Sequence, residues 1–372
     1  MSSSRYRNHR NNDYNHKPYK TIIAPKSNTI STYDHSLVTL SSIFFIGAVA
    51  WVPSLYIYLY KKWKSIPKDD DNIENKKKRR IYGAILVTVA FIGIMRPHRH
   101  PHVGKMLKFK KWRVWKAWAN FIAMEVISEV SSSSSSNPNF DMKKDQAIFA
   151  IMPHGVFPFP LGFAALPEVA RNAFGEFRPV VASAARFLPF VGTFLDWLGC
   201  VDATRASVEN ALAQGSRIGL SPGGIAEIFE GYPKPNRLPD DECLVLKSRK
   251  GFIRMALKYG VPIIPCYCFG GSKMLKRLQL PMVVEKVSNA LRISLVLIFG
   301  RWGLPIPFQR RMLYVIGNPI HPPQLDGSMG EDSVEFNQIV DKLHDRFCDE
   351  LTSLFERHKD NYGWGKKNLR IV

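Results

Sequence analysis

His154 is the side chain of this sequence best suited to acid–base chemistry, because it is the only histidine between residues 103 and 320. A neutral imidazole, with an ordinary pKa of about 6.5, can take a proton from an alcohol close to neutral pH. His154 follows a short apolar run and stands between Pro153 and Gly155, which mark a turn. Turns at strand ends often carry catalytic groups. We interpret His154 as a candidate general base; the alternative is a histidine held by hydrogen bonds in a packed loop.

A second candidate element is the sequence SPGGIAE at 221–227. The backbone amides of Gly223 and Gly224 could stabilise an oxyanion, because they follow an expected strand and precede a helix-like run. Glu227 is the nearest acid that could orient His154. A Pro-Gly-Gly sequence is more often an ordinary turn, so this motif is weak by itself.

Four cations gather near the start of an expected helix: Lys247, Arg249, Lys250 and Arg254. Cationic side chains beside a helix N-terminus can bind phosphate groups. The competing interpretation is a solvated helix face with surface ion pairs, which contribute little to stability.

The elements that would position these residues alternate between short apolar strands and helices, which is typical of an α/β layer fold. We expect one mixed sheet flanked by helices. The expected strands are 147–152, 179–183, 217–220, 261–269, 293–299 and 312–316, and the expected helices are 166–173, 206–214, 248–259 and 334–357.

Metal and disulfide chemistry find little support in the sequence. Its five cysteines include no CxxC pair and no spacing typical of metal ligands, so we expect reduced thiols. Cys266 and Cys268 alternate within an expected strand and are better explained by packing than by nucleophilic catalysis. The sequence HRHPH at 98–102 is better explained as a solvated basic strip than as a metal site. We expect no metal.

The positive charge of this chain is concentrated at one end. Residues 1–116 contain 23 Lys and Arg against 6 Asp and Glu, a net charge of +17, whereas residues 117–372 contain 29 against 25, a net charge of +4. A nucleic-acid-binding domain would carry its charge on the folded surface, so we expect no nucleic acid as a partner.

Two apolar stretches within that basic end predict a membrane anchor over 37–95. The stretch 37–60 has 24 residues without a charge, which is long enough for a membrane helix, and the shorter stretch 81–95 suits an embedded segment. We expect residues 1–36 to be a polar, disordered leader. A cleaved signal peptide or an organelle transit peptide is the alternative interpretation of this end.

Residues 96–130 carry aromatic residues interleaved with Lys and Arg, a pattern that predicts a helix at the membrane surface. A helix with its tryptophans in the domain core explains the pattern equally well. The serine run within 131–139 predicts a linker, after which 140–372 would form the catalytic domain.

Five blocks in this order resemble the diacylglycerol acyltransferase type 2 family, which belongs to the glycerolipid acyltransferase superfamily and includes monoacylglycerol and wax-alcohol acyltransferases. They are MPHGVFP at 152–158, RPVVASAARFLPFVGTFLDWLG at 178–199, SPGGIAE at 221–227, RKGFIRMALKYGVPIIPCYCFG at 249–270 and FGRWGLPIPFQRRMLYVIGNPI at 299–320.

The resemblance implies transfer of a fatty acyl group from acyl-CoA to the hydroxyl of diacylglycerol, with His154 as the catalytic histidine and Gly155 as its turn partner. Family patterns read His-Pro-His-Gly or Glu-Pro-His-Ser, whereas this chain has Met152 at the first position. The acid that the wider superfamily has four residues beyond its histidine is Pro158 here. The group that orients His154 is therefore open.

From this resemblance we expect a glycerolipid acyltransferase-like fold at the endoplasmic reticulum membrane, with the catalytic domain in the cytosol, and also association with lipid droplets. Acyl-CoA would be the co-substrate, with no dissociable cofactor, and its phosphates would bind the four cations. Its acyl chain would lie along apolar residues that core packing explains equally well: Phe157, Phe159, Leu161 and Phe163. Homo-oligomer formation stays open.

Two other functions remain in view from the sequence. A sibling enzyme would acylate monoacylglycerol, a long-chain alcohol or a lysophospholipid. A non-enzymatic scaffold would keep the anchor and the fold while binding a membrane or lipid-droplet surface.

Overall fold

The computed structural model describes residues 19–22, 30–68, 72–94, 107–130, 140–187, 191–230, 241–278, 283, 287, 296–325 and 329–372. Strand β3 (Ile148–Met152) lies in the interior of the main sheet, and all five of its residues are buried. This apolar run favours an interior position, because strands that are covered on both faces have continuous rather than alternating hydrophobic sequences.

The main sheet is mixed, as expected, and its strands follow the order β1-β2-β11-β8-β3-β6-β4-β5. Strand β3 is parallel to β6 and β8, and β4 continues the parallel part to β5. Strand β11 is antiparallel to β8 and parallel to β2. The bounds are β1 Tyr19–Ile22, β2 Glu125–Ser128, β4 Arg178–Val181, β5 Val201–Asp202, β6 Ile218–Leu220, β8 Ile263–Phe269 and β11 Leu313–Ile316.

Alternation along β3 sends its side chains into two separate cores. Phe149 and Ile151 pack in the core beneath α5 (Arg113–Phe121) and α6 (Phe159–Ala165). Ile148, Ala150 and Met152 pack in the core beneath α11 (Gly251–Tyr259) and α13 (Val334–Tyr362). The sheet is therefore covered by helices on both faces, which confirms the predicted α/β layer architecture.

The remaining elements lie around this sheet. The described helices and 3₁₀ turns are α4 Leu107–Lys110, η1 Glu168–Ala170, α7 Arg171–Phe174, η2 Ser183–Phe187, α8 Val191–Trp197, α9 Arg205–Ala213, α10 Gly224–Glu230, η3 Gly271–Lys273 and η4 Arg301–Gly303. Two small ribbons pair β9 (Lys276–Arg277) with β10 (Ile298–Phe299) and β7 (Glu242–Leu244) with β12 (Leu369–Ile371).

Most predicted elements of the domain are confirmed. The expected strands 147–152, 179–183, 217–220, 261–269 and 312–316 correspond to β3, β4, β6, β8 and β11, and the expected helices 206–214, 248–259 and 334–357 correspond to α9, α11 and α13. The strand expected over 293–299 is seen as the short β10, outside the main sheet, and residues 293–295 lie outside the described ones. The helix expected over 166–173 is wrong, because Pro167 disfavours helical backbone at the preceding residue and only η1 and α7 follow.

The single helix predicted over 37–60 is instead two helices, α1 (Thr32–Phe45) and α2 (Ala48–Ser65). The chain breaks at Gly47, whose amide bonds back to the Ser42 carbonyl at 3.1 Å. Helix α1 packs on the α/β domain, where buried Asp34 pairs with Arg113 at 2.7 Å and the Trp118 indole donates to Ser41 at 2.9 Å. Of the helices described, none alone is long and apolar enough to cross a bilayer, whereas α1 and α2 together, bent by 61°, have such a length and composition.

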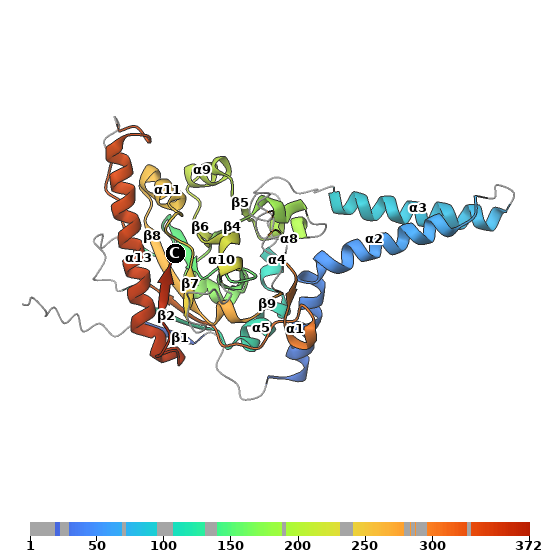
Figure 1. The fold of residues 1–372 in the computed structure, drawn as a ribbon, viewed down its shortest axis with the longest axis horizontal. Helices are drawn as coiled ribbons and strands as arrows, with labels where there is room; N and C mark the ends of the chain where they lie inside the picture. Colours follow the sequence, from blue (N-terminus) through green and yellow to red (C-terminus); the bar gives the residue numbers. More distant parts are fainter. Residues whose placement is uncertain are drawn as a thin grey trace, which may run out of the picture.

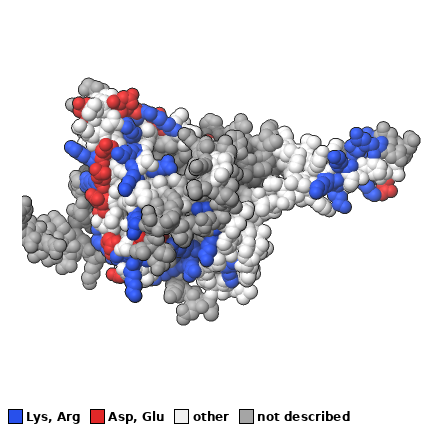
Figure 2. Space-filling model, in the orientation of Figure 1, with Lys and Arg blue, Asp and Glu red and all other residues white. Residues whose placement is uncertain are grey.

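Helix α3 (Ile73–Ile94) contains most of the predicted embedded segment 81–95 and lies beside α2 as a hairpin that projects from the domain (Figure 1). The two helices approach closely at Gly83, where an added Cβ would lie 3.3 Å from the Trp63 indole nitrogen. Figure 2 shows Lys and Arg gathered at the far end of this hairpin, beyond an uncharged shaft. Basic residues there include Lys61, Lys62, Lys64, Lys76, Lys77, Lys78, Arg79 and Arg80.

The surface helix predicted over 96–130 is also wrong within its described part, 107–130, which forms α4, α5 and strand β2. Trp115 and Trp118 are buried in the core, which is the alternative that the sequence left open. Residues 96–106 and the predicted linker 131–139 lie outside the described residues. In the leader expected to be disordered, residues 19–22 form β1 against β2, and α1 begins at Thr32.

Candidate active site

His154 lies just beyond the end of β3, at the sheet edge where β6 and β8 also end. Parallel strands bring their carboxyl ends to the same edge, so Ser221 after β6 and Gly271 after β8 lie nearby. The Ser221 hydroxyl donates to the Ile151 carbonyl at 2.8 Å. A Cβ added to Gly155 would lie 3.2 Å from the Gly271 carbonyl oxygen. The His154 loop is therefore held between its two neighbouring strands.

The His154 imidazole is fixed by its own loop. Its Nδ1 lies 2.8 Å from the Gly155 carbonyl oxygen, and Gly155 has φ +68°, a left-handed conformation that favours glycine. A carbonyl can only accept, so this contact assigns the proton to Nδ1 and leaves the lone pair on Nε2. Burial lowers the pKa of the half-buried His154 below its ordinary value, which keeps the ring neutral near pH 7.

Glu227 reaches His154, as the sequence suggested, but it contacts the backbone and not the ring. Its Oε2 accepts the His154 amide at 2.6 Å and its Oε1 accepts the Val245 amide at 3.2 Å. Burial raises the pKa of Glu227 to about 8, so the carboxyl is mostly protonated at neutral pH. Glu227 therefore positions the His154 loop, and the Gly155 carbonyl makes the contact with the imidazole that was predicted for Glu227.

The two glycines of the SPGGIAE turn, both predicted as oxyanion donors, make different contacts. A Cβ at Gly223 would lie less than 3.0 Å from three heavy atoms of the Glu227 side chain, so only glycine leaves room for that carboxyl. The Gly224 amide donates to the Ser221 carbonyl at 3.1 Å and closes the turn, which removes it as a free oxyanion donor. Gly224 has φ +52°.

A second buried acid, Glu242, adjoins this site and was missed from the sequence. Its carboxylate accepts from the Ser272 hydroxyl at 2.8 Å and pairs with Lys273 at 2.8 Å. The buried Tyr267 hydroxyl has no hydrogen-bond partner within the described part of the chain, and nearby Glu242 and Glu227 contribute to a pKa well above its ordinary value, after burial itself. Tyr267 opposes Met152 in the sheet register, a pairing that single-sequence patterns do not reveal.

The geometry can be compared with known proteins at this point. A sequence model of the family described as diacylglycerol acyltransferase matches residues 82–372. The chain belongs to this family. It is therefore an acyltransferase.

Individual relatives of this acyltransferase differ in the acceptor that their names state. Acyl-CoA wax alcohol acyltransferase 2 of Homo sapiens and diacylglycerol O-acyltransferase 2 of Dictyostelium discoideum are each 28% identical to it, over 60% of this chain and 69% of the relative. Diacylglycerol O-acyltransferase 2 of Homo sapiens is 26% identical over 58% of this chain, and this match spans only 57% of the human protein. The crystal structure of the 1-acyl-sn-glycerophosphate acyltransferase from Thermotoga maritima aligns with a TM-score of 0.36 at 17% identity, over 85% of this chain and 95% of that one.

The four predicted phosphate-binding cations of the acyltransferase divide into two pairs. Lys250 pairs with Asp341 at 2.8 Å, and Arg254 donates to the Asn337 side chain and, at 3.3 Å, to the Glu331 carbonyl. These two side chains tie α11 to α13 and to the segment before it. Lys247 and Arg249 are exposed and have no ion pair with a described acid, and the charge of Arg249 acts on Glu227, lowering the pKa of that carboxyl.

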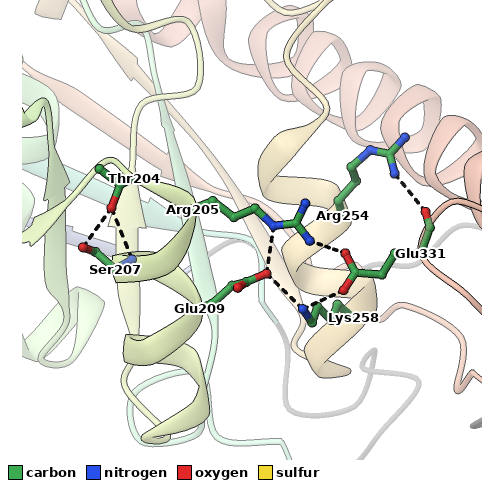
Figure 3. A network of polar contacts seen from close by, with 7 residues as sticks. All are labelled: Thr204, Arg205, Ser207, Glu209, Arg254, Lys258 and Glu331. Carbon is green, nitrogen blue, oxygen red and sulfur yellow. Dashed lines mark hydrogen bonds and ion pairs between the residues drawn. The ribbon is translucent and has the colours of Figure 1, made fainter.

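A neighbouring charge network is structural (Figure 3). Glu209 accepts from Arg205 at 3.0 Å and from Lys258 at 2.9 Å, while Glu331 pairs with both of these cations. The network connects α9, α11 and the chain entering α13. Its cations already have carboxylate partners, so they are poor candidates for a phosphate site.

The predicted acyl-tunnel residues are mostly core residues. Phe159 and Phe163 stack with ring centroids 5.6 Å apart, and each contacts the Trp118 ring; Leu161 on the same helix is also buried. This arrangement is the core packing that the sequence left open for these residues. Phe157 is only half-buried, and its role along an acyl chain stays a prediction.

Cysteine and metal chemistry remain unsupported in the described residues. Burial raises the pKa of the Cys266 and Cys268 thiols, which disfavours the thiolate that a nucleophile needs. No group of three or more His, Cys, Asp or Glu side chains in the described ranges could hold a metal ion. The HRHPH sequence at 98–102 lies outside those ranges.

Proposed function

We propose that this acyltransferase transfers a fatty acyl group from acyl-CoA to the free hydroxyl of diacylglycerol, forming triacylglycerol. The observation that supports the proposal is the His154 ring, whose Nδ1 faces the Gly155 carbonyl so that Nε2 is available as a base. Direct attack by an alcohol requires such a base, and a positioned histidine typically contributes about 10²- to 10⁴-fold in rate.

In the proposed step, Nε2 takes the proton of the acceptor hydroxyl while the hydroxyl oxygen attacks the thioester carbonyl carbon. The tetrahedral intermediate then collapses with cleavage of the carbon–sulfur bond, and the imidazolium returns its proton to the departing CoA thiolate. No acyl-enzyme forms. The amides of Gly155 and Gly223 are the remaining candidates for stabilising the oxyanion.

Glu227 supports this step by holding the loop that carries the base. As a mostly neutral carboxyl it accepts the His154 amide without placing a full negative charge beside the ring. The phosphates of acyl-CoA would bind Lys247 and Arg249, whose charges are unpaired in the described structure. The proposal requires no dissociable cofactor.

We place the enzyme at the endoplasmic reticulum membrane with its catalytic domain on the cytosolic side, and also at lipid droplets. Support comes from the shaft of the α2–α3 hairpin, which exposes Ile57, Tyr58, Val87 and Phe91. Exposed apolar surface of this kind is unfavourable in water and favourable in a bilayer.

A fatty alcohol is the second candidate acceptor, favoured by the match to wax alcohol acyltransferases. Monoacylglycerol and lysophospholipid remain further alternatives within the same chemistry. A scaffold without acyl transfer would make no use of a neutral, oriented imidazole.

The proposal can be tested with membranes from a triacylglycerol-deficient host that expresses this chain. They are supplied with labelled acyl-CoA and, separately, with diacylglycerol, monoacylglycerol, fatty alcohol and lysophosphatidate. We expect labelled triacylglycerol that disappears in His154→Ala. Labelled wax ester would instead identify a fatty alcohol as the acceptor, and labelled phosphatidate would identify lysophosphatidate. The absence of any labelled product from a folded, membrane-bound protein would favour the scaffold.

A further inference from the structure

A groove of about 500 Å³ lies between α1 and the turn η4, separate from the His154 site. Its α1 wall is a single helical stripe, because positions i, i+3, i+4 and i+7 share one face. The polar and aromatic residues that line it are Thr32, His35, Ser36 and Thr39 on α1, and Arg301 and Trp302 on η4.

Trp302 has an unusual backbone and an unusual exposure. Its φ is +56°, a conformation that few non-glycine residues adopt, and 71% of the residue is exposed. Such strain tends to persist where it serves a function. The Arg301 guanidinium lies 4.6 Å from the centroid of the Trp302 ring, and no acid within the described residues pairs with it. The groove therefore presents an unneutralised cation beside an exposed aromatic ring.

The chemistry around this cation fits a phosphate group with an apolar tail. The Thr32 and Thr39 hydroxyls on the α1 stripe can donate to phosphate oxygens, whereas the Ser36 hydroxyl already donates to the Thr32 carbonyl at 2.9 Å. Arg301 supplies the charge. Leu40, which also lines the groove, and Phe44, one turn further along α1, are 65% and 51% exposed. Tryptophan is itself enriched at the boundary between lipid and water.

The position of the groove indicates where such a ligand would come from. Helix α1 runs directly into the α2–α3 hairpin, and a Cβ added to Gly47 at the bend would lie 3.4 Å from Pro305, just after η4. The connection that carries Trp302 therefore also contacts the bend at which the hairpin begins.

We propose that this groove binds the phosphodiester headgroup of a membrane glycerophospholipid, with an acyl chain along Leu40 and Phe44. The inference rests on the membrane placement in the proposed function. A bound headgroup at this point would set the height of the catalytic domain above the bilayer.

The test uses the full chain reconstituted in dioleoylphosphatidylcholine nanodiscs, without acyl-CoA. A benzoylphenylalanine photo-crosslinker replaces Thr39 in the groove or, as a control, the exposed Lys342 on α13. We expect a glycerophospholipid adduct at position 39 only. The yield of the glycerophospholipid adduct should fall at least about tenfold in Arg301→Glu, because this variant removes the charged hydrogen bonds to the phosphate. The matched variant Arg310→Glu, at an exposed arginine in the same connection, should leave the adduct unchanged.

A glycerophospholipid adduct that persists in Arg301→Glu would show only that position 39 lies near lipid, and it would overturn the proposal. Crosslinking of position 39 to a protein instead of a phospholipid would overturn it as well. Displacement by excess acyl-CoA would also overturn it, by identifying the groove as a CoA phosphate site. Trp302→Ala, checked for an unchanged melting temperature, should lower the adduct as well and guards against misfolding of the arginine variant. Acyl transfer is assayed separately, so an inactive chain that still forms the adduct refutes the proposed function and leaves this inference standing.

Discussion

Gly223→Ala should reduce turnover by displacing Glu227, whose side chain does not meet the substrate, while it keeps the Gly223 backbone amide. Its new Cβ would overlap Glu227, while the Gly223 backbone lies outside the positive-φ region and accepts alanine. Displacing Glu227 would leave the His154 amide without its acceptor. An unsatisfied buried donor costs about 1–3 kcal/mol, and if this loss falls on the position of the base, kcat should drop roughly 5- to 150-fold.

The assay measures kcat for acyl transfer in Gly223→Ala, Glu227→Ala and the double variant. In the Glu227→Ala background the Cβ has space, so alanine at 223 should cause little further loss; this double-mutant cycle isolates the steric contact. Gly251→Ala is the matched control, because a Cβ there meets nothing within 4 Å. Near-normal kcat in Gly223→Ala, or an equal additional loss in the double variant, would refute the role assigned to Glu227.

Three further predictions concern the base, the CoA site and pH. His154→Ala should lose about 10²- to 10⁴-fold in kcat with an unchanged melting temperature, and near-normal turnover would remove His154 from the mechanism. Reversing the charges of Lys247 and Arg249 should raise the KM for acyl-CoA more than it lowers kcat; an unchanged KM would place the CoA phosphates elsewhere. Glu227 keeps its proton up to a pKa of about 8 in the folded protein but only to its ordinary value of 4.5 when unfolded. The contribution of Glu227 to the free energy of unfolding is therefore fully present below pH 4.5. It is lost as the pH rises towards 8, at roughly 1.4 kcal/mol per pH unit. Thermal unfolding at pH 5 and pH 7.5 should show a smaller difference in Glu227→Gln than in the wild type, and equal differences would contradict the buried, protonated carboxyl.

The domain's strands and long helices could be predicted because their signals are local. An apolar run such as that of β3 and the helical spacing of α13 depend only on neighbouring residues. The N-terminal region could not be predicted in the same way. The stretch 37–60 is uncharged like a membrane helix, yet the structure divides it between α1 and α2, and Asp34 and Ser41 of α1 bind side chains of α5 that lie more than 70 residues away in the chain.

The candidate site also combines residues that local sequence predicts with contacts that it does not. His154 could be found from its type and its turn, and Glu227 from its proximity to the Pro-Gly-Gly sequence. The packing of β6, β7 and the His154 loop decides that Glu227 accepts the His154 and Val245 amides. The same packing buries the Glu227 carboxyl and so raises its pKa. Tyr267 gave no local signal, because sheet register places it opposite Met152. Glu242 gave none either, because it reaches the site from β7 through contacts with Ser272 and Lys273.

The sequence by itself determined the α/β layering, the motif blocks shared with the acyltransferase family and the choice of His154 as the candidate base, since each depends on residue types at short spacing. Only the tertiary structure decided that a backbone carbonyl orients His154, that Glu227 holds its loop, and that Lys250 and Arg254 are already paired. The physical reason is that hydrogen bonding, desolvation and ion pairing act over a few ångströms in space between residues that are far apart in the chain.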